Sequence, residues 1–274
     1  MTTGYMHGVY GREIPSELVP GRYIESNVVV VGTAPVHTLA DIAKAPANTP
    51  VLCQSYTDFV SAFGWSDDWD AFTLCEVASS HFAKFGAAPV VFVNVLDLAR
   101  HTEAVADERA VFGEKDVVTL KHVPVSSPTV TDDTGVTTYM EGTDYTVDRQ
   151  SAQVRRLEGG TIEKLGEVKV SYSRIAPEAV TDKDIIGGVD AKSLKKTGLE
   201  LVDEVFPRFR IVPSCLIAPK FGESPAVAIS SAAKMSTINS LFTGITIMDI
   251  PTSEVPSLMD APGWKEKNSL LLTL

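Results

Sequence analysis

The run NVVVVGTAP at residues 27–35 constrains the fold more than any other stretch of this 274-residue chain. Four consecutive valines closed by Gly32 are typical of a strand that is buried on both faces, as strands inside a parallel sheet are. Parallel neighbours must be joined by crossover connections, which usually contain a helix. A second apolar strand, PVVFVNV at residues 89–95, follows a helix-like stretch. The sequence therefore predicts an α/β fold with a mostly parallel sheet.

The pattern changes between residues 101 and 177, where short strand-like pieces alternate with turn signals. In the piece EVKVSYS, Val168, Val170 and Tyr172 face one way, while polar residues face the other. Short strands at this spacing predict a small antiparallel β-sandwich or barrel that interrupts the α/β core. The predicted segments are an N-terminal arm (1–26), the first part of the core (27–100), the inserted β-sandwich domain (101–177) and the second part of the core (178–274).

A strong helix signal follows three aspartates, Asp67, Asp68 and Asp70. We expect these carboxylates to cap the helix at its positive end; a metal site is the alternative for the same three residues. The predicted buried face comprises side chains at helical spacing: Leu74, Ala78, His81, Phe82 and Phe85. His81 is interpreted as a packed core histidine.

Two further helices are predicted in the second part of the core. Asp190 is expected to cap a helix whose apolar stripe begins at Leu194 and which ends at Pro207. Residues 224–241 are expected to form another helix, because Ser-Pro supplies a cap followed by proline at the first helical position.

Composition argues against several classes of function. The net charge of −11 argues against nucleic-acid binding, which needs clustered Lys and Arg. The longest apolar runs are far too short to span a membrane, so no membrane partner is expected. Cys53, Cys75 and Cys215 are widely spaced, and we expect them to be buried apolar residues of a protein kept in a reducing compartment. No cofactor and no metal are predicted.

No motif for catalysis is visible in the sequence. Gly32 stands without the other glycines of a dinucleotide-binding turn, and Pro35 occupies the place where a helix would begin. The patterns of phosphate-binding loops, nucleophile elbows and paired zinc histidines do not occur either. A Ser-His-Asp triad assembled only by folding stays open, since all three residue types occur. We therefore expect a protein that is not an enzyme and nominate no catalytic residue.

Basic residues concentrate in two places on this acidic chain. They are Lys192, Lys195 and Lys196, and then Arg208 and Arg210. On a protein that self-assembles, such basic patches can meet acidic patches of a neighbour. We interpret these five residues as candidate assembly residues, with an ordinary solvated surface as the alternative.

Several stretches of the chain resemble the sheath proteins of contractile phage tails, of the myophage type also found in tail-like bacteriocins. The segment His7-Gly8-Val9-Tyr10, followed by Glu13, is similar to the family's N-terminal segment. The block that contains DYTVD, RRLEGG and VKVSYS looks like its β-sandwich domain. The other matching segments are residues 28–36, 50–52, 58–64, 85–95, 181–188, 209–219 and 245–251.

The resemblance implies a structural protein whose core is subtilisin-like by fold. Sheath subunits stack as hexameric rings around a tail tube and contract to drive the tube through the host envelope. The implied partners are other sheath subunits, the tail tube protein and the baseplate. The implied location is the contractile tail of a virion, after synthesis in the host cytoplasm. Since the family's terminal arms exchange strands with neighbours, Tyr10 and Glu13 in the N-terminal arm are expected to take part in assembly.

The chain departs from the family in its length. Family members continue into a C-terminal domain that completes the strand exchange, whereas this sequence stops at Leu274. We therefore expect a sheath protein that lacks the usual C-terminal domain and that can be monomeric on its own. Two alternatives stay open: an α/β hydrolase or nucleotide-binding enzyme with a β insertion, and a non-contractile baseplate module.

Overall fold

The computed structural model describes residues 27–268. Its largest sheet contains β1 (Val28–Gly32), β2 (Pro50–Cys53), β3 (Val90–Asn94), β12 (Cys215–Ile217) and β13 (Ile245–Ile247). The strand order is β13-β12-β1-β3-β2, with β1 at the centre. The pairs that join β13, β12, β1 and β3 are parallel, and β2 closes the far edge antiparallel to β3. The two apolar strands predicted at residues 27–35 and 89–95 are confirmed as β1 and β3.

The valine run forms a central strand because apolar groups cover both of its faces. Val28 to Val31 are at most 6% exposed, and burial of each such side chain is worth about 1.5–3 kcal/mol. The surrounding cluster includes Phe59 and Phe63 from α1, Leu74 from α2 and Val227 from α5. The α-helices are α1 (Tyr56–Phe63), α2 (Thr73–Ala78), α3 (Asp182–Ile186), α4 (Val202–Phe209), α5 (Pro225–Ser236) and α6 (Ala261–Lys267).

Helix α5 lies within the helix predicted at residues 224–241, but it ends earlier, at Ser236. Pro225 occupies its first position, as the Ser-Pro signal predicted. The Ser224 hydroxyl makes no capping bond to the helix; it donates to Asp182 Oδ2 at 2.5 Å. This side chain therefore ties the start of α5 to α3.

Helix α2 starts later than predicted and does not use the three aspartates as caps. It begins at Thr73, with no side-chain cap at its N-terminus. Asp68 Oδ1 instead accepts the backbone N–H of Ala71 at 3.2 Å and so closes the preceding turn. Asp67 Oδ1 accepts the indole N–H of Trp65 at 3.0 Å. The cap prediction is wrong because the short polar side chains organise local turns before the helix begins.

The continuation of α2 winds as a π-helix, η3 (Ser79–Lys84). The wider turn rotates every later side chain around the helix axis, so the regular helical spacing no longer predicts the buried face. His81 and Phe82 are half-buried, and Phe85 is 78% exposed. Phe82 packs against the main apolar cluster, as predicted, whereas Phe85 does not belong to the buried face and His81 is not a core histidine.

Residues 188–197 form a β-hairpin where a helix was predicted. β10 (Gly188–Val189) pairs antiparallel with β11 (Lys196–Thr197). Asp190 caps the connecting turn, since its Oδ1 accepts the backbone N–H of Lys192 at 3.1 Å, and Leu194 is 74% exposed. Helical structure starts only with the 3₁₀ turn η5 (Gly198–Leu201) and continues into α4, which contains Pro207 instead of ending at it.

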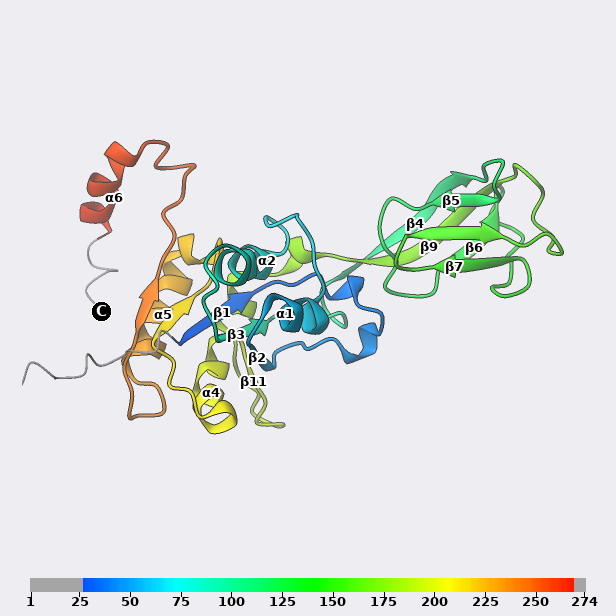
Figure 1. Ribbon diagram of the computed structural model, residues 1–274. Helices are drawn as coiled ribbons and strands as arrows, with labels where there is room; N and C mark the ends of the chain where they lie inside the picture. Colours follow the sequence, from blue (N-terminus) through cyan, green and yellow to red (C-terminus); the bar gives the residue numbers. More distant parts are fainter. Residues whose placement is uncertain (1–26, 269–274) are drawn as a thin grey trace, which may run out of the picture.

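Residues 102–175, which we call the β module, form two antiparallel three-stranded sheets, β4-β9-β6 and β5-β8-β7. Their strands are β4 (Thr102–Val111), β5 (Val117–Thr119), β6 (Thr129–Asp132), β7 (Tyr145–Asp148), β8 (Gln153–Arg156) and β9 (Glu167–Ile175). Both sheets pack around one apolar cluster, which contains Val168, Val170 and Tyr172 of β9, as the alternation predicted. Figure 1 shows the module projecting from the remaining described residues, which we call the α/β part, on the long strands β4 and β9.

Together, the five-stranded sheet, the hairpin and the two sheets of the β module make this a mixed α/β protein with a mixed sheet and several antiparallel sheets.

The three cysteines are buried and free, as predicted. Within residues 27–268, no helix combines the length and the apolar character needed to cross a membrane. The same residues contain no group of three or more His, Cys, Asp or Glu side chains placed to hold a metal ion.

Candidate functional site

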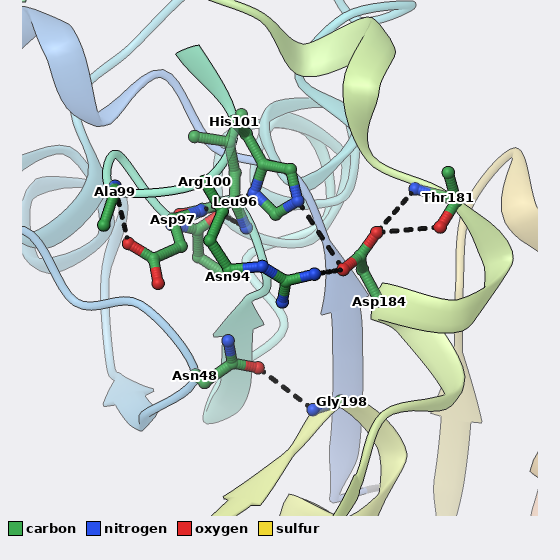
Figure 2. Close-up of polar contacts among 10 residues, drawn as sticks. All are labelled: Asn48, Asn94, Leu96, Asp97, Ala99, Arg100, His101, Thr181, Asp184 and Gly198. Atoms are coloured by element: carbon green, nitrogen blue, oxygen red, sulfur yellow. Dashed lines mark hydrogen bonds and ion pairs between the residues drawn. The ribbon is translucent and has the colours of Figure 1, made fainter.

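A network of polar side chains lies where the chain leaves the α/β part and where it returns (Figure 2). We call it the junction network. It comprises Asn48, Asn94, Asp97, Arg100, His101, Thr181 and Asp184. These residues come from the end of β3, the turn before β4, the loop before β2 and the start of α3.

A tight turn over residues 97–101 leads from β3 into the β module. Asp97 Oδ1 accepts the backbone N–H of Ala99 at 2.9 Å, and the Asp97 carbonyl accepts the N–H of His101 at 2.7 Å. The His101 ring folds back, and its Nδ1 accepts the Asp97 N–H at 2.9 Å. A neutral ring in this position carries its proton on Nε2, the nitrogen that faces α3. The turn therefore fixes both the position and the tautomer of a histidine that is 3% exposed.

Asp184 in α3 faces this turn with one carboxylate oxygen and caps its own helix with the other. Its Oδ1 lies 3.0 Å from Arg100 Nη2 and 3.6 Å from His101 Nε2. Its Oδ2 accepts the backbone N–H of Thr181 at 2.9 Å and the Thr181 hydroxyl at 2.8 Å. Burial alone would raise the pKa of Asp184, but the hydrogen bonds from Thr181, with His101 and Arg100 nearby, hold it below its ordinary value.

Asn94 at the end of β3 ties three loops together. It is fully buried, and its Oδ1 accepts the backbone N–H groups of Ala34 at 3.1 Å and Leu96 at 3.0 Å. Its amide donates to the carbonyls of Pro46 and Leu96, both at 3.0 Å. The Asn94 carbonyl accepts the N–H of Asn48 at 2.7 Å. One side chain thereby satisfies backbone groups that would otherwise be buried without partners.

Asn48 extends the network to the second half of the chain. Its Oδ1 accepts the backbone N–H of Gly198 at 3.0 Å, at the start of η5. Gly198 has φ +58°, and a Cβ there would lie 2.2 Å from the Ile185 carbonyl oxygen. Only glycine fits this close approach, which holds η5 against the end of α3.

A pocket of about 450 Å³ opens at the carboxyl ends of β1 and β12, where ligands bind in many open α/β sheets. Its polar lining residues include Thr33, Asp68, Asp70, Glu178 and Lys220. Two of these polar groups already have partners within the protein: the Thr33 hydroxyl donates to the Ala71 carbonyl at 2.8 Å, and Lys220 Nζ donates to the Asp70 carbonyl at 2.7 Å. No histidine or cysteine is among the residues that line the pocket. The hydrogen bonds of Thr33 and Lys220 engage these two groups within the fold itself.

The C-terminal part of the described chain has an exposed apolar surface, which consists of β13 and the segments around it. The outer edge of β13 has no strand partner among residues 27–268. Leu241, Ile245 and Ile247 are 79%, 65% and 50% exposed. A groove of about 700 Å³ beside this strand is lined by Met248, Trp264 and other mostly apolar residues, some of them from α6. Open edges and apolar patches of this kind are typical of surfaces that meet another polypeptide.

The predicted assembly residues lie on two surface elements. Lys192 and Lys195 are exposed in the turn between β10 and β11, and Lys196 is half-buried in β11. Arg208 on α4 is paired with Glu204, with 2.6 Å between Nη2 and Oε2. Arg210, directly after α4, is exposed, and its guanidinium lies 5.9 Å from the centre of the Phe206 ring. Tyr10 and Glu13 lie outside the described residues.

No sequence motif marks the junction network as a whole. Two local signals were available: Thr181 followed three residues later by Asp184, which is typical of a capping box, and a polar Asn94 inside an apolar strand. The contact between His101 and Asp184 joins residues 83 positions apart and has no local signal.

Comparison with known proteins gives matches to a family model, to a curated protein and to a solved structure. A family model described as "Protein of unknown function UCP028589" matches residues 97–181. The tail sheath protein of Burkholderia phage BcepMu is 31% identical over 239 residues, which cover 85% of this chain and 47% of that protein. The crystal structure of the sheath tail protein Lin1278 from Listeria innocua matches with a TM-score of 0.36 and 12% identity, over 83% of this chain and 48% of that one.

This mixed α/β protein is related by sequence to phage tail sheath proteins, and the expected resemblance to them is confirmed. The chain spans about half the length of the curated relative that it matches.

Proposed function

We propose that this chain is a structural subunit of a contractile phage tail sheath. In this role it assembles as stacked rings around a tail tube, and contraction of the rings drives the tube through the host envelope. The observation that supports this most is the 31% identity to a phage tail sheath protein across 85% of the chain. The proposed partners are other sheath subunits, the tube protein and the baseplate, and the proposed location is the virion tail.

The proposed architecture is a subtilisin-like core interrupted by an inserted β-sandwich domain. The separate apolar clusters of the α/β part and the β module support a division near residues 101 and 177. The family model supports the same division, because its match runs from the exit turn at Asp97 to Thr181, the N-cap of α3. In this proposal the arm 1–26 and the core segments 27–100 and 178–274 keep their predicted boundaries.

The proposed assembly surface uses charge and apolar contacts together. Lys192 and Lys195 are exposed, so they are free to meet acidic groups of another subunit. Arg208 is already paired with Glu204 within its own helix, so it is a weaker candidate than the lysines. The exposed edge at Ile245 and Ile247 supports contact with a further polypeptide.

A structural role is proposed in place of catalysis. The pocket at the carboxyl ends of β1 and β12 is the place where a hydrolase or nucleotide-binding site would be expected. Its Thr33 and Lys220 side chains are hydrogen-bonded to backbone carbonyls, which supports a structural role for these two groups.

Sedimentation velocity tests the proposal. The 29.5 kDa chain is compared with an extended version, in which it is joined to the part of the BcepMu sheath protein that lies outside the match. We expect the extended version to form species many times larger than a monomer. Monomers from both proteins, together with hydrolysis of ester substrates or binding of nucleotides by the original chain, would overturn the proposal in favour of the enzyme.

A further inference from the structure

The β module is joined to the α/β part by a narrow two-stranded ribbon. β4 and β9 pair antiparallel from Thr102↔Ile175 outward, and the Ala176 N–H donates to the His101 carbonyl at 2.9 Å. Because these bonds join the two strands to each other, they keep the ribbon intact without fixing its angle to the core. The angle must be set by contacts between the ribbon's base and a fixed element of the α/β part.

Helix α3 is such a fixed element. Ile185 is completely buried in the main apolar cluster, and Asp182 Oδ2 accepts the Ser224 hydroxyl at the start of α5. The backbone of Gly187 packs tightly against β11, since a Cβ at Gly187 would lie 1.9 Å from the Thr197 carbonyl oxygen. A side chain on α3 therefore has a well-defined position relative to the sheet.

Asp184 is the α3 side chain that contacts both connections of the ribbon. Through Oδ1 it meets Arg100 and His101, which directly precede β4. Through Oδ2 it holds Thr181, which lies on the chain that returns from β9. The Asp184 and His101 side chains are only 9% and 4% exposed, so little water competes for the contact between them, whereas the Arg100 side chain is 64% exposed.

The other contacts near the ribbon are of two kinds. Ile175 at the end of β9 is buried in the main apolar cluster, and Val125 of the β module packs against the same cluster, so both side chains also restrain the module. Arg174 forms ion pairs with Glu103 and Glu178, whose side chains are each 57% exposed. Exposed pairs of this kind contribute little to a fixed geometry. Ile175 and Val125 are thus the principal competing restraints.

We propose that Asp184 is a positioning residue that sets the angle between the β module and the α/β part. Without its contacts to Arg100 and His101, the ribbon becomes a pivot while both apolar clusters stay folded. This inference concerns the conformation of the single chain and does not depend on assembly into a tail.

Distance measurements between two spin labels test this directly. Cysteines are introduced at Thr146 on β7 and Ala233 on α5, both exposed positions. The native thiols interfere little, because burial raises the pKa of Cys53 to about 12 and that of Cys75 to about 11 and also raises that of Cys215. Pulsed electron spin resonance then gives the distribution of distances between module and core in the full chain.

The decisive variant is Asp184→Asn. Its amide oxygen can still accept the Thr181 N–H, while its NH₂ group faces the donors of Arg100 and His101. We expect a narrow distance distribution in the parent and a broad one in this variant, with near-ultraviolet circular dichroism unchanged. The matched control is Thr181→Ala, which removes a capping hydroxyl but keeps the backbone bond to Asp184, and it should leave the distribution narrow.

A distribution in Asp184→Asn as narrow as in the parent would overturn the proposal and assign the angle to the apolar contacts of Ile175 and Val125. Equal broadening in Thr181→Ala would also overturn it, because the effect would then follow from a weakened helix cap. If Asp184→Asn fails to fold, Arg100→Ala supplies the measurement, since the Arg100 side chain is 64% exposed and its loss leaves both clusters intact. An unchanged distribution in Arg100→Ala would then count against the proposal.

Discussion

Replacement of Asn94 by alanine gives the sharpest test of the energetics of the junction network. The side chain is fully buried and makes four hydrogen bonds to backbone groups of Ala34, Pro46 and Leu96. Alanine removes all four without changing the apolar packing of β3. The substitution therefore isolates the cost of leaving buried backbone groups without partners.

The two backbone N–H groups that lose their acceptor, those of Ala34 and Leu96, decide how strongly Asn94→Ala destabilises the protein. Ala34 and Leu96 are both completely buried, so water cannot replace the lost acceptor. Each unpaired buried N–H costs about 1–3 kcal/mol, which gives a destabilisation of about 2–6 kcal/mol. The two carbonyls that lose a donor add less, because carbonyl oxygens tolerate incomplete pairing better than N–H groups do. Against a typical total of about 5–15 kcal/mol, Asn94→Ala is expected to bring the α/β part close to unfolding at room temperature.

Urea unfolding followed by tryptophan fluorescence measures this part of the chain selectively. The three tryptophans, Trp65, Trp69 and Trp264, all lie outside the β module. The matched control is Asn268→Ala, which removes one bond from Nδ2 to the Trp264 carbonyl at the end of α6 and should cost less than about 0.5 kcal/mol. An Asn94→Ala midpoint equal to that of the control would refute the assignment of Asn94 as the residue that satisfies these loops.

Three further predictions follow from the same structure. Because the pKa of Asp184 is lowered in the folded state, its ionised form stabilises the fold above a pH of about 4, and that stabilisation is lost as the pH falls towards the folded pKa. The urea midpoints of the parent and of Asp184→Asn should therefore converge on acidification. A difference between the two midpoints that stays constant with pH would contradict this prediction. Reversing charge at Lys192 and Lys195 to glutamate should weaken assembly of the extended version at low salt, while Lys115→Glu on the β module should not; equal sedimentation profiles for both would remove the lysines from the interface. The native thiols should not react with a thiol reagent at neutral pH until urea unfolds the chain, because burial raises the pKa of Cys53 to about 12 and of Cys75 to about 11. Rapid reaction of the folded protein would disprove the burial of these thiols.

The parts of the fold that could be predicted are those in which burial repeats along the sequence. The valine run of β1 is buried at every position, and the alternation of β9 reflects burial at every second position along most of the strand. Such patterns are visible because a strand that is covered on both faces, or on one, needs apolar side chains at every position or every second position.

The elements that were missed have backbone features that interrupt their pattern. β4 contains a bulge between Val105 and Glu108, with Asp107 at φ 53°, so its alternation breaks in the middle of the strand. The π-turn in η3 shifts Phe85 away from the core in the same way. The hairpin at residues 188–197 carries a misleading helix signal, because Asp190 is as suitable for capping a turn as for capping a helix.

The junction network could be predicted only in fragments. The capping box at Thr181 and Asp184 has a local signature, whereas the approach of Arg100 and His101 to Asp184 arises from tertiary structure. Asn48 and Gly198 lie 150 positions apart and meet only because the first and second parts of the core pack together. Contacts of this range leave no periodic trace in one sequence.

Negative-stain electron microscopy of the extended version, beside the chain alone, tests the central claim most directly. The extended version carries the part of the related sheath protein that lies outside the match, and the chain alone provides the background. A tail sheath subunit should give tubes or stacked rings from the extended version. Featureless monomers in both samples would contradict the claim that this chain is built to form a tail sheath.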